Sequence, residues 1–462
     1  MEKSDGEGIR EMEKNTVYKE NIGIQDRLGM MFSGANITLF IVIAAFLTYF
    51  YTDVVGLNPG VIGTVLLVSK VFDGISDLVL GNIVDRTRTA KGVCRPWVFR
   101  IAVFFGLGIV MLFTVPDVGN AGKVAYLFIV YNVSQTLIYT ISSLAVQSLP
   151  TYITRNPAQQ RELYAWNNVG CGILSTLVSG ITIQLVTRLG GDQKAWVLVA
   201  FGYAVITSLF LLLTGMLCKE RVNPDELTNS EEKVSFWKAL KAICQNKYWF
   251  LVLGIVIVGA GVYATSMQMH TYYAKYVLGD VNIAGALNSA YVAPTLILGI
   301  LLVPISRYIS AKRIILIGVS LQLLGCIMII AAPANIKILT VATIFKGVSQ
   351  CCGTGMFLAM LGQAIEYGQW KTGVRSQAMM VAANGAGQKI GNGVITAVLG
   401  FIMSAIGYSG TQEVQSAATM SGISGIYLYI PLVLTILQIV FVLMYDLDKK
   451  YDTIVRELQE RA

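Results

Sequence analysis

The sequence predicts an all-α membrane protein with about twelve transmembrane helices in two six-helix halves. Of its 462 residues, 55% are hydrophobic and only 13% are charged, and the mean hydropathy is +0.62. Apolar runs of about 20 residues, long enough to cross ~30 Å of hydrocarbon, recur from Met30 to Met444. A soluble domain of this length does not normally have such a composition.

Polar breaks between the apolar runs set the approximate ends of the predicted helices. The predicted spans are residues 29–51, 58–84, 98–115, 123–148, 166–187, 195–217, 249–275, 282–305, 313–332, 338–362, 379–406 and 423–445. The first run is long enough to span by itself, and the residues before it mix acidic and basic side chains. We therefore expect no cleaved signal peptide, and a first helix that remains as an anchor.

A long hydrophilic interruption at 219–247 separates six spans from six. The predicted division is a cytoplasmic tail at 1–28, a six-helix bundle at 29–217, a cytoplasmic linker at 218–248, a second bundle at 249–445 and a cytoplasmic tail at 446–462. A weak internal repeat supports two related halves, because Tyr49 and Gly56 recur at the same spacing as Tyr272 and Gly279. Halves related in this way enclose a binding cavity between them.

Lysine and arginine are concentrated in alternate loops, which the positive-inside rule places in the cytoplasm. These residues are Arg86, Arg88, Lys91, Arg95, Arg100, Arg155, Arg161, Arg307, Lys312, Arg313, Lys371 and Arg375. The opposite loops are poor in cations. We therefore expect a multi-pass protein of the plasma (cytoplasmic) membrane with both termini in the cytoplasm.

The composition also argues against several other classes of protein. The formal charge of +8 lies in short loops and not on one soluble segment, so no nucleic-acid partner is expected. The seven cysteines lack metal-ligand spacing, and we interpret them as structural. Because no phosphate-cradling glycine loop or paired metal ligands occur, we expect neither an enzyme nor a bound cofactor.

The second span carries three charges, Lys70, Asp73 and Asp77, within an arc of ~60° on one helix face. An aspartate at the bilayer centre costs roughly 2.5–3.5 kcal/mol, so these side chains require pairing or a water-filled cavity. Together they sum to minus one, which Na⁺ or a proton would neutralise. The alternative is a structural pair of Lys70 with Asp73, with Asp77 hydrated near the helix end.

The fourth span has a polar stripe through an otherwise apolar helix. Its members are Asn132, Thr136, Tyr139, Ser143 and Gln147. Such a stripe faces water or another helix, but not lipid. Hydroxyls and amides in this pattern suit a polyol. Interhelical hydrogen bonding, worth about 0.6 kcal/mol per contact, is the competing interpretation.

In the eleventh span Asn384, Gln388 and Asn392 recur every four residues beside Lys389, and we expect Asn384 and Gln388 to bind the cargo. Lys389 is too deep to reach the interface comfortably. If it faces the cavity it pairs with Asp73 or Asp77, and the four groups then sum to zero. A cation would have to displace the lysine.

Other polar residues near span ends have two interpretations each. We expect Lys346 to extend to the interface along its own stem, the alternative being contact with an acidic cargo such as a uronide. His270 is expected to be a hydrogen-bonded interfacial histidine and not a proton relay. Trp166, next to Asn167 and Asn168, is either an interface anchor or an aromatic face for a sugar ring.

Four motifs together resemble the glycoside, pentoside, hexuronide and cation symporter family of the major facilitator superfamily, which includes the melibiose permease. They are residues 51–57 (YTDVVGL), 73–77 (DGISD), 95–97 (RPW) and 366–375 (EYGQWKTGVR). The likeness covers almost the whole chain after residue 26.

This resemblance implies a twelve-helix fold in two halves, and uptake of glycosides coupled to Na⁺, H⁺ or Li⁺ by alternating access. Asp73 and Asp77 match the family's cation-binding carboxylates, which would be the metal ligands if the ion is Na⁺. Thr140 matches a threonine that joins them, and Lys389 matches a lysine close to the pair.

The sequence departs from the melibiose permease at two sugar-binding aspartates. In their places stand Gly34-Ala35-Asn36-Ile37 in the first helix and Ser143 in the fourth. We expect Asn36, Ser143 and Gln147 to offer neutral hydrogen bonds instead, to a cargo other than melibiose.

The leading hypothesis is therefore symport of a monovalent cation with a small-molecule sugar or glycoside of the pentoside or hexuronide type. The expected protein is a monomer in the lipid bilayer. The alternatives are a carrier of the same fold for a lipid or other non-sugar solute, and a membrane sensor that binds sugar without moving it.

Overall fold

The computed structural model describes residues 22–85, 87, 89, 92–222, 236–306, 308–374, 377–412 and 414–461. Within these ranges the chain is nearly all helical, and each of the twelve predicted spans coincides with one helix or with consecutive helices. The predicted fold class is therefore confirmed. The predicted domain boundaries remain predictions, and residues 1–21 and 223–235, within the predicted tail and linker, lie outside the described residues.

Six spans form the N-terminal half. They are α2 (Ile24–Ala45) continued by α3 (Leu47–Tyr49) and η1 (Phe50–Val54); α4 (Pro59–Asp85); α5 (Arg95–Phe113); α6 (Asn120–Tyr131) continued by η2 (Asn132–Tyr139) and α7 (Thr140–Ile153); α8 (Pro157–Arg188); and α9 (Gln193–Leu217).

Six further spans form the C-terminal half, which α10 (Phe236–Cys244) precedes. They are α11 (Lys247–Tyr276); α12 (Ile283–Val292) with α13 (Pro294–Ile305); α14 (Ala311–Ala331); α15 (Ile336–Thr372); α16 (Gln377–Ala405); and α17 (Ala417–Met444). A short 3-10 turn (Leu447–Lys449) and α18 (Tyr451–Arg461) follow.

Nine helical stretches of the described chain are long and apolar enough to cross a membrane. Of the other three predicted spans, α4 and α16 carry the intramembrane charges Lys70, Asp73, Asp77 and Lys389, and the third includes a shorter apolar stretch, Ile283–Gly299, that runs across the boundary between α12 and α13. Among the predicted cytoplasmic cations, Arg86, Arg88, Lys91, Arg307 and Arg375 lie outside the described residues.

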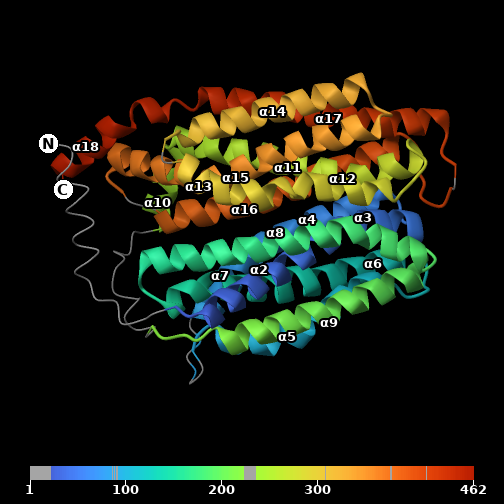
Figure 1. The fold of residues 1–462 in the computed structure, drawn as a ribbon, viewed down its shortest axis with the longest axis horizontal. Helices are drawn as coiled ribbons and strands as arrows, with labels where there is room; N and C mark the ends of the chain where they lie inside the picture. The colour runs from blue at the N-terminus through green and yellow to red at the C-terminus, as the bar shows by residue number, and fades with distance from the viewer. Residues whose placement is uncertain are drawn as a thin grey trace.

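The two halves form two groups of parallel and antiparallel helices, with α10 and α18 at one end of the molecule and α3 at the other (Figure 1). The halves meet mainly along two helix pairs, α4 with α16 and α8 with α12. The second contact depends on glycine, because a Cβ added to Gly285 would lie 2.3 Å from the carbonyl oxygen of Gly180. Small residues at such crossings let helix backbones approach closely.

The weak sequence repeat has a structural counterpart at the end of the first helix in each half. Gly56 follows η1 with φ +81°, and Gly279 follows α11 with φ +78°. Both glycines therefore adopt the left-handed conformation that L side chains rarely take. The repeat thus marks equivalent helix ends at the α3 end of the molecule.

At this end a buried carboxylate joins the halves. Asp53, whose side chain is 1% exposed, accepts hydrogen bonds at 2.6 Å from both Lys275 Nζ and Tyr276 Oη. It also accepts hydrogen bonds from the hydroxyls of Tyr408 and Thr52. Only Thr52 lies in the same half as Asp53. We call Asp53 with Lys275, Tyr276 and Tyr408 the interhalf latch.

Candidate functional site

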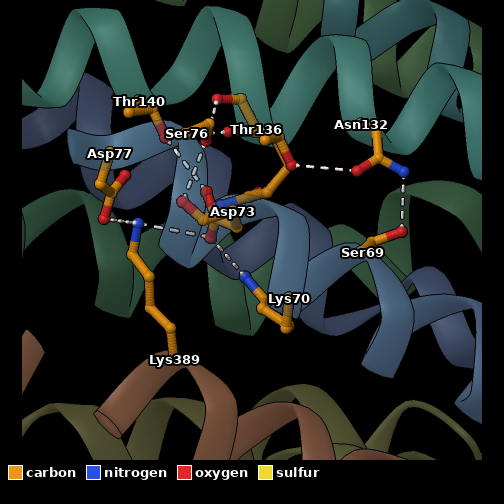
Figure 2. A network of polar contacts seen from close by, with 10 residues as sticks. Ser69, Lys70, Asp73, Ser76, Asp77, Asn132, Thr136, Thr140 and Lys389 are labelled. Atoms are coloured by element: carbon orange, nitrogen blue, oxygen red, sulfur yellow. Dashed lines mark hydrogen bonds and ion pairs between the residues drawn. The ribbon is translucent and has the colours of Figure 1, made fainter. Parts of the chain in front are cut away.

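The centre of the site is the Asp73 carboxylate on α4, which is 1% exposed. Lys70 Nζ lies 3.4 Å and Lys389 Nζ lies 3.3 Å from its Oδ2 atom. The hydroxyl of Thr140 donates to its Oδ1 atom at 3.2 Å. The residues expected to hold a cation are thus brought together, and Figure 2 shows them converging from α4, the fourth span and α16.

Asp77, one turn further along α4, takes its partner from the opposite half. Lys389 Nζ lies 2.6 Å from its Oδ2 atom, and both side chains are 29% exposed. The lysine therefore bridges the two carboxylates across the interface between the halves. The net charge of minus one expected for α4 alone becomes zero when Lys389 is included, which is the second of the two arrangements that the sequence allowed.

The fourth span reaches this site through a local change of helix geometry. Residues Asn132–Tyr139 form a π-helical segment, and Thr140 begins the next α-helical stretch. Such wider turns are frequent at functional sites because they redirect side chains. Here Thr140 points to Asp73, while Ser76 on α4 donates to the carbonyl oxygens of Asp73 and Thr136.

A cavity of about 410 Å³ adjoins the charged groups, a size typical of small-molecule sites. Polar and aromatic side chains line it from both halves. From the N-terminal half these are Thr48, Lys70, Asp73, Tyr131, Gln135 and Tyr139. From the C-terminal half they are Tyr263, Gln268, Gln388, Lys389, Asn392 and Thr396. Aromatic faces combined with amides suit a hydroxylated cargo.

Of the residues proposed to bind sugar, Tyr139 and Gln388 line the cavity, as does Asn392. Asn132 and Thr136 bond one another, and the Asn132 amide also donates to Ser69 on α4 at 2.8 Å. Asn132 therefore joins the fourth span to α4, as the competing interpretation of the stripe expected, whereas the Thr136 side chain bonds within its own helix.

The other proposed sugar ligands lie away from the lining of this cavity. Asn36 is fully buried, and its amide has no hydrogen-bond partner among the described residues. Ser143 donates to the carbonyl of Thr140, and Asn384 accepts from Gln388. Gln147 is exposed on α7.

Asn167 donates to Ser33 on α2 and thereby ties α8 to the first helix. Asn168, the next residue, is exposed. Trp166 is half-buried and packs on the hydrophobic core of the N-terminal half. None of the three lines the cavity.

Two expectations for the C-terminal half are corrected. Lys346 does not extend to an interface, because it is 1% exposed with its ammonium 5.5 Å from the centre of the Tyr427 ring. His270 is hydrogen-bonded as expected, through Nδ1 to Asn288 Oδ1 at 2.7 Å, but it is fully buried and not interfacial. Neighbouring helices cover both positions, which sequence depth alone does not reveal.

Sequence reasoning missed several cavity residues and the interhalf latch. Thr396 stands alone in an apolar run, whereas Gln135 and Gln268 have polar neighbours in the sequence. Without a partner helix, nothing in the sequence indicates which way these three side chains point. For Asp53 the internal repeat could have given a prediction. At the spacing of the repeat Asp53 corresponds to Tyr276, and the two residues are in contact in the structure.

A cavity between two helical halves, lined in part by polar side chains and adjoined by a charge-balanced network of two acids and two lysines, defines a secondary transporter of the major facilitator fold. Comparison with known proteins agrees. The model of the MFS/sugar transport protein family matches residues 29–449. This chain therefore belongs to the MFS/sugar transport protein family.

Several named relatives are similar along nearly their whole length. The isoprimeverose transporter of Lactiplantibacillus pentosus is 26% identical, over 97% of this chain and 94% of the relative. The inner membrane symporter YicJ of Escherichia coli is 27% identical, over 92% of each chain. The putative glycoside/cation symporter YagG of the same organism is 27% identical, over 89% of each.

Solved structures show the same fold at lower identity. A bacterial homologue of the human lysosomal transporter Spinster, in an inward-facing conformation, has a TM-score of 0.63 at 12% identity, over 93% of this chain and 97% of that one. The nucleoside transporter NupG has a TM-score of 0.61 at 15% identity, over 92% of this chain and 100% of that one.

Proposed function

We propose that this protein moves a sugar or glycoside across the plasma membrane by alternating access, driven by symport of Na⁺ or H⁺. The observation that carries the proposal is the bridge from Lys389 on α16 to Asp73 and Asp77 on α4, beside a cavity that polar side chains line in part. The network places the carboxylates, whose charge an ion would neutralise, at the interface where the two halves must move.

The charge balance suggests how the ion and the movement are coupled. Without an ion, the positive charge of Lys389 satisfies both carboxylates. A Na⁺ ion held by oxygens of Asp73, Asp77 and Thr140, or a proton on one carboxylate, weakens this bridge. Release of Lys389 then frees α16 from α4, so ion binding favours a different arrangement of the halves.

The lining of the cavity and the relatives support a sugar as cargo. Tyr139 and Gln388, with the neighbouring amides, suit a hydroxylated molecule better than the apolar cargo of a lipid carrier. The relatives are named as an isoprimeverose transporter and a glycoside/cation symporter. We therefore propose a glycoside of the pentoside or hexuronide type, carried by a monomer whose two termini are cytoplasmic.

The direct test is Asp77→Cys in proteoliposomes, with accumulation of radiolabelled glycosides measured under an imposed Na⁺ or pH gradient. We expect the variant to lose gradient-driven accumulation while keeping some sugar binding or exchange, because the cavity is retained and the ion site is not. Asp117→Cys, at an exposed loop acid, is the matched control. If Asp77→Cys concentrates cargo as the parent does, the coupling assignment is wrong.

The same assay separates a transporter from a sugar sensor. A transporter accumulates cargo in proportion to the imposed gradient. A sensor shows saturable binding and no accumulation under either gradient.

A further inference from the structure

Lys346 on α15 is a buried cation that the proposed coupling site does not use. Its side chain is 1% exposed, and no acidic side chain of the described residues pairs with it. An unpaired charge in a protein interior is costly unless an anion or a shift of protonation compensates it. This lysine is thus a buried basic group whose described neighbour is the Tyr427 ring.

The groups around Lys346 are also short of partners. The Nε2 atom of His270 and the hydroxyls of Tyr291 and Tyr427 have no hydrogen-bond partner among the described residues. The His270 ring lies 5.7 Å from the Tyr427 ring and 6.4 Å from the Tyr291 ring, measured between centroids. The groups come from α11, α12, α15 and α17, so four helices converge on one polar cluster. Buried polar groups are normally bonded, so these groups can bind water or the polar atoms of a cargo.

The cluster lies directly behind the wall of the cavity. On α11, Tyr263 and Met267 line the cavity, and His270 follows them on the same helix face. The Tyr263 ring lies 5.6 Å from the Tyr291 ring. Tyr263 and Tyr291 therefore connect the cavity to His270, and Tyr427 connects His270 to Lys346.

We propose that Lys346, His270 and Tyr291 form an anion subsite that takes a carboxylate or sulfonate group carried by a hydroxylated cargo. This subsite rests on the proposed transport function and names a chemical feature of its cargo. The ammonium of Lys346 and the hydroxyl of Tyr291 donate to the anionic group. Tyr263 and Met267 must move aside to admit it.

The hydrogen bond of His270 adds a requirement for a hydroxyl beside the anionic group. Asn288 Oδ1 accepts from the Nδ1–H of His270 in the assigned amide orientation. The neutral imidazole then offers Nε2 as an acceptor. A hydroxyl of the cargo donates to this atom, so the subsite fits a sugar acid and not an isolated anion.

The charges of the two halves are consistent with this assignment. Lys70, Asp73, Asp77 and Lys389 sum to zero at the ion site. Lys346, when protonated, adds one positive charge that no acidic side chain of the described residues pairs. A monoanionic cargo neutralises it, which lowers the cost of moving the loaded protein through the closed intermediate.

The experiment compares an acidic and a neutral probe of the same size in purified, reconstituted protein. Methyl β-D-glucuronide and 6-deoxy-6-sulfo-D-glucose are the acidic probes, and methyl β-D-glucoside is the neutral one. Binding is measured by calorimetry and uptake by counterflow. The variants are Lys346→Met, Lys346→Arg and, as the matched control on the exposed start of α15, Lys337→Met.

We expect the parent to bind at least one acidic probe more tightly than the neutral one. Lys346→Met is expected to weaken that binding about 10- to 100-fold, as loss of a charge-assisted hydrogen bond does, and to change binding of the neutral probe less than about threefold. Lys346→Arg retains the charge and is expected to retain part of the preference. Lys337→Met is expected to behave like the parent.

Three results would overturn the anion subsite. One is a parent that binds neither acidic probe, and another is unchanged acid binding in Lys346→Met. The third is an equal loss of affinity for acidic and neutral probes in Lys346→Met, which would indicate that the lysine is structural. Failure of the transport proposal is distinct, because it is a lack of gradient-driven accumulation by a parent whose acid binding still depends on Lys346.

Discussion

The interhalf latch predicts that Asp53→Asn shifts the protein toward opening at the α3 end. Asp53 is buried and bonds Lys275, Tyr276 and Tyr408 of the other half. These contacts exist only while the two halves touch at this end. The substitution preserves size and shape but removes the negative charge. It therefore destabilises the closed arrangement, while the open arrangement, which lacks these contacts, is unaffected.

The size of the shift follows from the contacts removed. Asparagine keeps one oxygen acceptor, so the net loss corresponds to about two charge-assisted hydrogen bonds at roughly 1.5 kcal/mol each. A total of about 3 kcal/mol changes the ratio of closed to open protein by about 100-fold. In the variant, Lys275 also lacks a carboxylate partner in the closed arrangement, which shifts the equilibrium further toward the open one.

Accessibility of a cavity residue measures this opening. Thr48 lines the cavity in the first helix, so Thr48→Cys in right-side-out vesicles can be labelled with a membrane-impermeant maleimide. We expect rapid labelling of Thr48→Cys when Asp53→Asn is also present and slow labelling when it is not. The labelling of the seven native cysteines, measured in the parent, is subtracted. Asp280→Asn, an exposed acid after α11, is the matched control. Equal labelling rates in a folded Asp53→Asn protein would refute the latch.

Three further predictions concern the ion site and the packing of the halves. Lys389→Met is expected to abolish accumulation while raising the affinity of the carboxylates for Na⁺ or a proton, because the lysine ammonium no longer competes for them. A sodium or pH titration of tryptophan fluorescence measures this affinity. Thr140→Ala removes one oxygen ligand and is expected to weaken ion binding about 10-fold, by loss of a hydrogen bond to a charged group, in the same titration. Gly170→Ala is expected to lower the free energy of unfolding by about 1–3 kcal/mol, because the added Cβ would lie 1.9 Å from the Met31 carbonyl oxygen. The control Gly202→Ala, at a helix position with open space around it, is expected to cost no stability. Thermal unfolding in detergent measures both variants.

The fold was predictable because helices must satisfy their own backbone in lipid. Apolar length alone locates every span, including those that charge or proline interrupts, such as α4 and the break before Pro294. The packing partners were not predictable in the same way. Gly285 facing Gly180 is a contact between distant helices, and a single sequence shows only that both residues are small.

The charged site was more predictable than the polar cavity. Lys70, Asp73 and Asp77 are costly in lipid, so their presence in an apolar run already indicates a site, and depth makes Lys389 a partner for them. Neutral residues carry no such signal. Hydroxyls and amides can bond their own helix or a neighbour, as Ser143 does, and only the arrangement of helices decides which of them face the cavity.

The internal repeat explains why the latch and the ion site differ in kind. Positions related by the repeat lie against each other at the α3 end, where the Tyr49 and Tyr272 rings are 5.8 Å apart and Asp53 meets Tyr276. The same spacing carries Asp73 to Leu296 on α13, so the second half has no matching acid. Equivalent positions of the two halves therefore meet at the α3 end, while the ion site lies in the N-terminal half and is joined to the C-terminal half by Lys389. A change of charge on one helix can in this way release a contact on which both halves depend.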